Sequence, residues 1–243
     1  FPVTQISLLA IFLFWFIGIY NAVNLLDGLD GLAGGFMVLV CIGATLDGSG
    51  AFAQLNVVLA TLLLGFLVFN QRISKLFMGD AGSLFLGFHI AVMPTLLAEN
   101  IPFSTTINTT PFVLLATYLI ADTTRVFFTR LAVKKSPMTA DTIHFHHVIL
   151  QQSGSYLASI GSIYFVTLIT TLLAAYSFSN LLSVNSMLGH LALLLFFILT
   201  PPIQTYVPIF MRLVKPFYRL QKNKETKSPF LPRTLFIGFL LIG

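Results

Sequence analysis

The sequence has very little charge. Only 9% of its 243 residues are Asp, Glu, Lys or Arg, whereas 56% are hydrophobic, and the mean hydropathy is +0.91. A water-soluble globule could not bury that much apolar side-chain surface. The composition therefore excludes a soluble protein and predicts a protein of the lipid bilayer.

The chain also lacks any pair of cysteines. Cys41 is the single cysteine, so an internal disulfide is excluded, and its apolar surroundings in the sequence predict a small packing residue. His89 and His190 are likewise isolated in apolar stretches, where a hydrogen-bonded packing histidine is expected.

Long hydrophobic runs, by contrast, are present throughout. Seven segments are apolar enough to cross a bilayer, and an eighth begins at Leu235. This pattern predicts an all-α fold, a polytopic transmembrane helix bundle with cytoplasmic catalytic loops, in a single integral membrane domain over residues 1–243. The expected segments are 3–20, 32–46, 55–69, 84–98, 111–128, 157–178 and 187–207.

The basic residues orient these segments. All thirteen Lys and Arg fall at alternate connections, which the positive-inside rule places in the cytoplasm. The net charge of +5 therefore indicates membrane orientation and contact with anionic headgroups, and no nucleic-acid partner. The basic stretch 210–222 is typical either of a helix on the inner leaflet or of a flank that follows a spanning segment.

A first polar motif follows the first expected span. Asn21, Asn24, Asp27 and Asp30 recur every third residue, so on a helix they would share one stripe. Their oxygens are hard donors suited to Mg²⁺ or to fixing a sugar and a diphosphate. A helix cap followed by a turn is the alternative, but the doubled Asp-Gly pair after two Asn favours a functional site.

A second polar motif lies at a connection of the same parity. It contains Asn70 and the sequence Gly79-Asp80-Ala81-Gly82, just before the span expected at 84–98. Asp80 is suited to hold a cation that bridges phosphates, and the glycines allow close backbone approach. An ordinary helix cap is the alternative, but the shared interface favours a second wall of one site.

A third polar motif runs from Asp122 through Arg130 to a histidine cluster formed by His144, His146 and His147. Imidazole N–H groups preceded by cations are suited to bind a diphosphate and to attract an anionic substrate. A zinc site is disfavoured, because no cysteine lies nearby to complete the usual tetrahedral set.

Together the three motifs, over about residues 21–147, resemble the polyprenyl-phosphate N-acetylhexosamine-1-phosphate transferases. This superfamily includes phospho-N-acetylmuramoyl-pentapeptide transferase and undecaprenyl-phosphate N-acetylglucosamine-1-phosphate transferase. The order His-x-His-His is more similar to the N-acetylglucosamine branch. By motif, Asp80 looks like the family's Mg²⁺-binding Asp, and the His cluster looks like its histidine loop.

The resemblance implies transfer of a sugar 1-phosphate, such as N-acetylglucosamine 1-phosphate, from a UDP-sugar to undecaprenyl phosphate, with release of UMP. It would be the first membrane step of a cell-envelope polysaccharide pathway at the bacterial inner membrane. Mg²⁺ is the implied cofactor, with Mn²⁺ as a substitute, and a homodimer is compatible with the family. The implied roles are metal ligands for Asp80 and Asp27, catalytic organisers for Asp30 and Asn70, and substrate contacts for Asn21, Asn24, Arg130, His144, His146 and His147.

We also expect the chain to be a piece of a longer protein with further spanning helices upstream. It begins with Phe1, and no two of its acidic residues are adjacent, whereas the family it resembles has an upstream motif with adjacent carboxylates. A membrane transporter with acidic residues near its midplane and a non-catalytic remnant are the alternatives to a transferase. The motifs lie at the ends of the expected spans, which disfavours the transporter.

Overall fold

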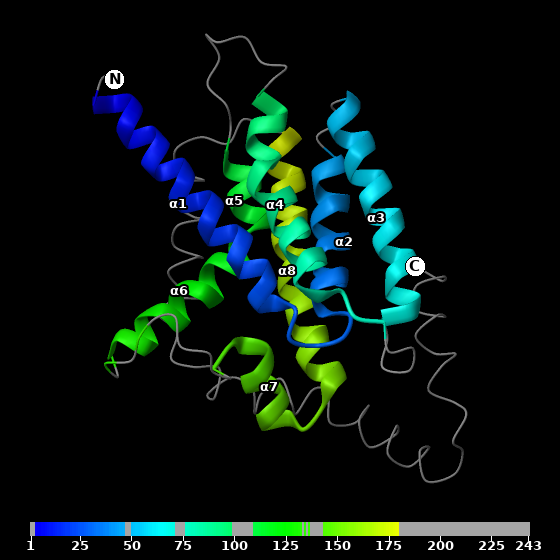
Figure 1. The fold of residues 1–243 in the computed structure, drawn as a ribbon. Helices are drawn as coiled ribbons and strands as arrows, with labels where there is room; N and C mark the ends of the chain where they lie inside the picture. Colours follow the sequence, from blue (N-terminus) through cyan, green and yellow to red (C-terminus); the bar gives the residue numbers. More distant parts are fainter. Residues whose placement is uncertain are drawn as a thin grey trace. The chain divides into compact units, whose positions relative to one another are not determined.

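The computed structural model describes residues 3–46, 50–70, 76–98, 109–132, 134, 136 and 143–179. The chain divides into two compact units, 1–200 and 201–243, and every described residue lies in the first. All regular structure in the described part is α-helical, which confirms the all-α prediction (Figure 1). The helices are α1 (Val3–Leu26), α2 (Leu32–Thr45), α3 (Gly50–Asn70), α4 (Gly79–Ala98), α5 (Thr110–Leu115), α6 (Thr117–Ala132), α7 (Phe145–Ser153) and α8 (Tyr156–Ser179).

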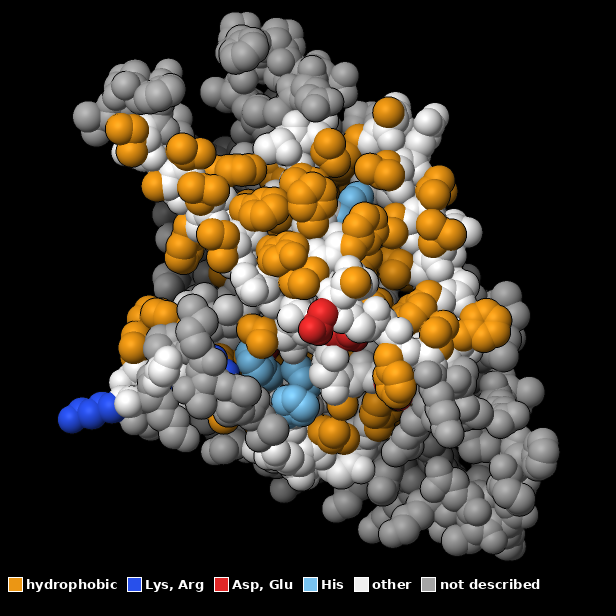
Figure 2. All heavy atoms as spheres, viewed as in Figure 1, with side chains coloured by type: hydrophobic (Ala, Val, Ile, Leu, Met, Phe, Trp, Pro, Cys, Tyr) orange, Lys and Arg blue, Asp and Glu red, His pale blue; other side chains and the backbone are white. Residues whose placement is uncertain are grey.

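Three of the described helices are long and apolar enough to cross a membrane, namely 9–26 in α1, 50–70 in α3 and 156–178 in α8. α2 is a shorter apolar helix. These helices expose large hydrophobic side chains, for example Phe14, which is 83% exposed. Figure 2 shows such side chains covering much of one face. Water would oppose this exposure and lipid would not, so the protein is a multi-pass helical membrane protein.

Close helix packing depends on small residues and on bonds from side chains to the backbone. α1 packs on α4, and α2 packs on α3 and α8. At Gly87 of α4 a Cβ would come within 2.5 Å of the Tyr20 carbonyl of α1, so only glycine permits this approach. One turn further along α4, the Trp15 indole donates to the Ala91 carbonyl at 3.0 Å.

The segment expected to span at 111–128 differs from the prediction. It is divided at Ala116, whose φ of −89° and ψ of 0° end α5, and α6 begins at the next residue. α6 carries Asp122, Arg125 and Arg130, and polar side chains of this kind suit a helix that packs partly outside the apolar core of a membrane. Figure 1 shows α6 running obliquely to α8.

His89 and Cys41, each isolated in an apolar stretch of the sequence, are packing residues as expected. Nε2 of His89 lies 2.9 Å from Oδ1 of Asn56, and Cys41 is buried and free. His190, the spans expected at 187–207 and from 235, and the basic stretch 210–222 lie outside the described residues.

The α1–α2 turn, residues 76–78 before α4 and α7 lie at the same end of the bundle, the lower end in Figure 1. Each lies within, or directly beside, one of the three polar motifs. The helical connectivity thus gathers these motifs at one end of the membrane-spanning helices.

Candidate active site

The first motif is part helix and part turn. α1 ends at Leu26, and Gly31 adopts φ of 80°, a left-handed conformation that a side chain would strain, so that α2 begins at the next residue. Asn21 and Asn24 are therefore helical, whereas Asp27 and Asp30 lie in the turn. The expectation that all four side chains share one helical stripe is wrong, because the helix ends before the first Asp-Gly pair.

Asn70, the last residue of α3, joins this turn to the segment that precedes α4. Its Oδ1 accepts the Gly31 N–H at 2.6 Å, and its Nδ2 donates to the Leu76 carbonyl at 2.6 Å. The Asn70 side chain is buried, and these bonds engage both ends of its amide. Asn70 therefore braces the first motif against the second.

Hydroxyl groups of α8 hold the same region from another side. Tyr156 donates to the Asp30 carbonyl, and Tyr164 donates to the Gly31 carbonyl at 2.6 Å. Ser159, between them on α8, donates to the carbonyl of His146 at 2.7 Å. α8 thus fixes the α1–α2 turn and the histidine segment to one rigid element.

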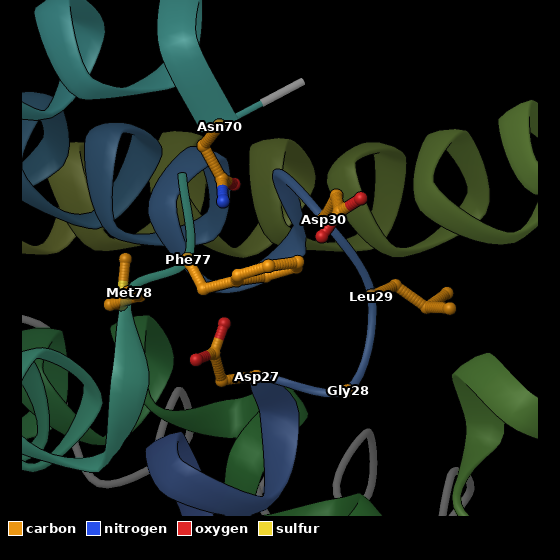
Figure 3. Close-up of a pocket in the computed structure, with 7 residues that line it drawn as sticks. All are labelled: Asp27, Gly28, Leu29, Asp30, Asn70, Phe77 and Met78. Atoms are coloured by element: carbon orange, nitrogen blue, oxygen red, sulfur yellow. The ribbon is translucent and has the colours of Figure 1, made fainter. Parts of the chain in front are cut away.

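A pocket of ≈ 180 Å³ opens between the first two motifs. Figure 3 shows the Phe77 ring between Asn70 and Asp27, with Asp30 on the far side of the pocket and Leu29 pointing away. Seven residues line the pocket: Asp27, Gly28, Leu29, Asp30, Asn70, Phe77 and Met78.

The carboxylates at the pocket influence one another. The pKa of Asp27 is raised to about 6. Burial is the largest cause, and the negative charges of Asp30 and Asp80 add to it. Asp80 lies in the first turn of α4 and is exposed. The two lining carboxylates and Asp80 therefore form a region of negative charge that a bound cation would stabilise.

The donor chemistry of this region fits Mg²⁺. In the described ranges no three His, Cys, Asp or Glu residues surround one metal position. Mg²⁺, however, keeps several waters and takes only one or two protein carboxylates together with substrate phosphates. Asp27, Asp30 and Asp80 supply hard oxygen donors whose mutual repulsion a divalent cation would relieve.

The histidine cluster packs directly against the first motif. A Cβ at Gly28 would lie 2.6 Å from Nε2 of His146 and 3.3 Å from Nε2 of His147, so the turn and the cluster touch at this glycine. The rings of His144 and His146 are stacked, with centroids 5.9 Å apart, and the centroids of His146 and His147 are 4.2 Å apart. Figure 2 shows acidic and histidine side chains side by side.

Two rings of this cluster, those of His144 and His146, have nitrogens that make no hydrogen bond within the described part of the chain. In the described part of the chain, both nitrogens of His146 and Nε2 of His144 are buried without a hydrogen-bond partner. Burial, followed by the neighbouring His147, lowers the pKa of His146 to about 4, so this ring is neutral at neutral pH. Buried polar atoms of this kind are costly unless a ligand or water pairs with them.

Asp122 on α6 organises the segment that carries the cluster. Its Oδ2 lies 2.8 Å from Nδ1 of His144, and its Oδ1 accepts the Phe145 N–H at 3.0 Å. Arg125 donates to Oδ1 of Asp122 at 2.9 Å and to the Ile143 carbonyl at 2.5 Å. Its guanidinium also lies 4.3 Å from the centroid of the Phe145 ring.

Residues 1–98, which contain the first two motifs, match the family model of glycosyl transferase family 4. Over these residues the chain is similar to glycosyl transferase family 4. It is 36% identical over 166 residues to the probable undecaprenyl-phosphate N-acetylglucosaminyl 1-phosphate transferase of Bacillus subtilis strain 168, covering 66% of this chain and 45% of that protein.

Two further relatives have related names. The decaprenyl-phosphate N-acetylglucosaminephosphotransferase of Mycolicibacterium smegmatis is 32% identical over 181 residues, covering 66% of this chain and 45% of the relative. A phospho-N-acetylmuramoyl-pentapeptide-transferase of Streptococcus thermophilus is 47% identical over 85 residues, covering 33% and 25%. The chain thus spans less than half the length of these curated relatives.

Some residues predicted from the sequence to contact the substrate do not line the pocket. Nδ2 of Asn21 donates to the Ile17 carbonyl of its own helix at 2.7 Å. Oδ1 of Asn24 accepts the Ser83 hydroxyl at 2.6 Å, which links α1 to α4. Arg130 is buried in the last turn of α6. The predicted roles of these three side chains in substrate binding stay predictions.

Several other residues at the site received no functional role from the sequence. Phe77, Tyr156 and Tyr164 belong to apolar or aromatic stretches where nothing in the sequence distinguishes them from packing residues. Asp122 and Arg125 do carry a signal, because an acidic and a basic residue three positions apart in an apolar stretch predict a buried pair.

Proposed function

We propose that the protein transfers a sugar 1-phosphate from a UDP-sugar to a polyprenyl phosphate at the cytoplasmic face of the bacterial inner membrane. N-Acetylglucosamine is the proposed sugar and undecaprenyl phosphate the proposed lipid, as the names of the relatives suggest. One observation carries the proposal. A group of carboxylates meets the His146 and His147 rings at Gly28, and both ring nitrogens of His146 are buried without a partner in the described part of the chain.

In the proposed reaction, an oxygen of the lipid phosphate attacks the β-phosphorus of the UDP-sugar. The bond from this phosphorus to the bridging oxygen breaks, UMP leaves with that oxygen, and the sugar phosphate becomes part of a lipid-linked diphosphate. Both reactants are anions, so catalysis depends on positioning and on stabilisation of negative charge.

The carboxylates and the histidines would have different roles in this reaction. Asp80 and Asp27 would hold Mg²⁺, with Asp30 beside them and Asn70 keeping the turn in place. The bound ion would neutralise phosphate charge as it develops. His144, His146 and His147 would donate N–H groups to the diphosphate oxygens, and Arg130 would add positive charge at the end of α6.

The test is Mg²⁺-dependent release of UMP from UDP-N-acetylglucosamine by membranes that contain the protein and undecaprenyl phosphate. Asp80→Asn should lower turnover by a factor of about 100 or more, because one charge at the phosphoryl group is lost, while the melting temperature is retained. Asp47→Asn is the matched control, since it makes the same change at a connection of opposite parity. Near-normal rate and Mg²⁺ dependence in Asp80→Asn would remove Asp80 from the proposed metal site.

The same assay separates the transferase from a transporter. A transporter would move a solute across the membrane without releasing UMP. Wild-type membranes that release no UMP from any of a panel of UDP-sugars would overturn the proposed function.

A further inference from the structure

Asp122 is a buried carboxylate that the proposed reaction does not use. It projects from α6 onto the segment 143–145, where it contacts the His144 ring and the Phe145 N–H. The side chains of Asp122 and His144 are 8% and 6% exposed, so solvent has little access to the pair. Because the pair is desolvated, each of these hydrogen bonds is electrostatically stronger than it would be at the surface.

The contacts fix which nitrogen of His144 carries a proton. Asp122 is paired with the Arg125 guanidinium and is therefore a carboxylate, which can only accept hydrogen bonds. Nδ1 of His144 must then be the donor to Oδ2. The remaining nitrogen, Nε2, is buried and has no partner in the described part of the chain, so it is the atom available to a ligand.

Asp122 also completes the start of α7. His144 occupies the N-cap position of this helix, but its side chain makes no capping bond. Oδ1 of Asp122 instead accepts the N–H of Phe145, the first helical residue. A negative charge at a helix N-terminus is favourable, so the same carboxylate secures both the helix start and the imidazole.

Asp122 would offset the charge of a His144 ring that binds an anion as an imidazolium. When Nε2 also takes up a proton, the positive charge of the imidazolium faces Asp122 across a 2.8 Å contact. Arg125 shares the other oxygen of that carboxylate. The stacked ring of His146 is neutral at neutral pH, because its pKa is lowered, and so adds no repulsion.

We propose that Asp122 is a positioning residue that holds His144 with Nδ1 toward α6 and so lets Nε2 donate a charged N–H to the diphosphate of the UDP-sugar. This inference rests on the proposed function for its ligand. Asp122 itself touches neither substrate nor the reacting atoms.

Asp122→Asn separates this role from a purely structural one. Two donors, the Phe145 N–H and Arg125, converge on Oδ1, so the amide oxygen of Asn should take that position and preserve the helix cap. The amide NH₂ then faces Nδ1 of His144, which must become an acceptor. The ring is left neutral, and its bond to the diphosphate loses the assistance of charge.

The expected result is a rise in KM for UDP-N-acetylglucosamine of about 5- to 30-fold, the difference between a charged and a neutral hydrogen bond, with a smaller change in kcat. His89→Leu is the control for destabilisation. It removes a buried 2.9 Å contact between α3 and α4, and should lower the melting temperature with KM unchanged. A KM for Asp122→Asn within twofold of wild type would overturn the inference.

Nitrogen-15 NMR of labelled histidine provides a readout that does not require turnover. His144→Gln identifies the ring signals of His144. With UDP and Mg²⁺ as the probe, wild type should show both nitrogens of His144 protonated, whereas Asp122→Asn should show an unprotonated Nδ1. The same protonation in both proteins would overturn the inference. Absence of UMP release by wild type would instead refute the proposed function, while the ring signals still decide the role of Asp122.

Discussion

Gly28→Ala tests the contact between the first motif and the histidine cluster. A Cβ at this position would lie 2.6 Å from Nε2 of His146, against the 3.4 Å at which ordinary contact begins, so the two must separate by about 0.8 Å. His146 is fully buried, packs on two neighbouring rings and is tied to Ser159 through its carbonyl, so it cannot simply rotate away. Overpacking of this kind costs about 1–3 kcal/mol.

The catalytic effect should exceed the effect on stability. A shift of this size moves the imidazoles away from the carboxylates, and misplacement by about 1 Å lowers turnover by about 100-fold. UMP release at saturating substrate measures the rate, and thermal unfolding measures stability. Comparing the loss of turnover with the loss of stability in Gly28→Ala therefore distinguishes an effect on the position of the imidazoles from an effect on folding.

Gly161→Ala is the matched control, because Gly161 is an exposed helical residue of α8 with open space at its Cβ. This substitution should stabilise the protein by about 0.5–1 kcal/mol with turnover unchanged. If Gly28→Ala retained a turnover within threefold of wild type, the argument that the two motifs work in contact would be refuted.

Three further predictions follow from the site and the topology. Because the pKa of Asp27 is raised from 3.8 to about 6, the stability it contributes is full below 3.8 and is lost as pH rises through 6. In Mg²⁺-free buffer the melting temperature should fall between about pH 4 and 6 and level off at higher pH, and Asp27→Asn should flatten this fall; identical slopes in the two proteins would contradict the raised pKa. Tyr164→Phe removes the donor to the Gly31 carbonyl and should lower the free energy of unfolding by about 1–2 kcal/mol in denaturant titration, and no change would show that another group satisfies this carbonyl. Cysteines introduced at Ser49 and Ser136 should be labelled from opposite sides of sealed cells, and labelling of both from one side would refute the orientation.

Hydropathy alone predicted most of the helical architecture, because uninterrupted apolar runs in lipid can satisfy their backbone only as helices. It failed where polar residues continue a helix or where a helix breaks without a visible signal. α1 extends beyond Tyr20 because its polar residues find hydrogen-bond partners. The Asn21 side chain donates to a carbonyl of its own helix, and the Asn24 side chain accepts the Ser83 hydroxyl. The break at Ala116 has no Gly or Pro to indicate it.

The site was predicted as three motifs, but not the way in which they are joined. Asn70 was expected to organise metal or diphosphate, whereas its amide bonds Gly31 and Leu76 on either side. Partners of this kind depend on contacts between residues far apart in the sequence, which no local pattern records. Asp122 illustrates the same point, since its bonds reach across 22 and 23 positions to the histidine segment.

The bonds from α8 have an evolutionary consequence. Tyr156, Ser159 and Tyr164 all donate to main-chain carbonyls, so the scaffold recognises the backbone of the turn and of the histidine segment, and not their side chains. Substitutions at the accepting positions would leave these bonds available. The side chains of these segments can therefore vary while the backbone of the turn and of the histidine segment stays held in place.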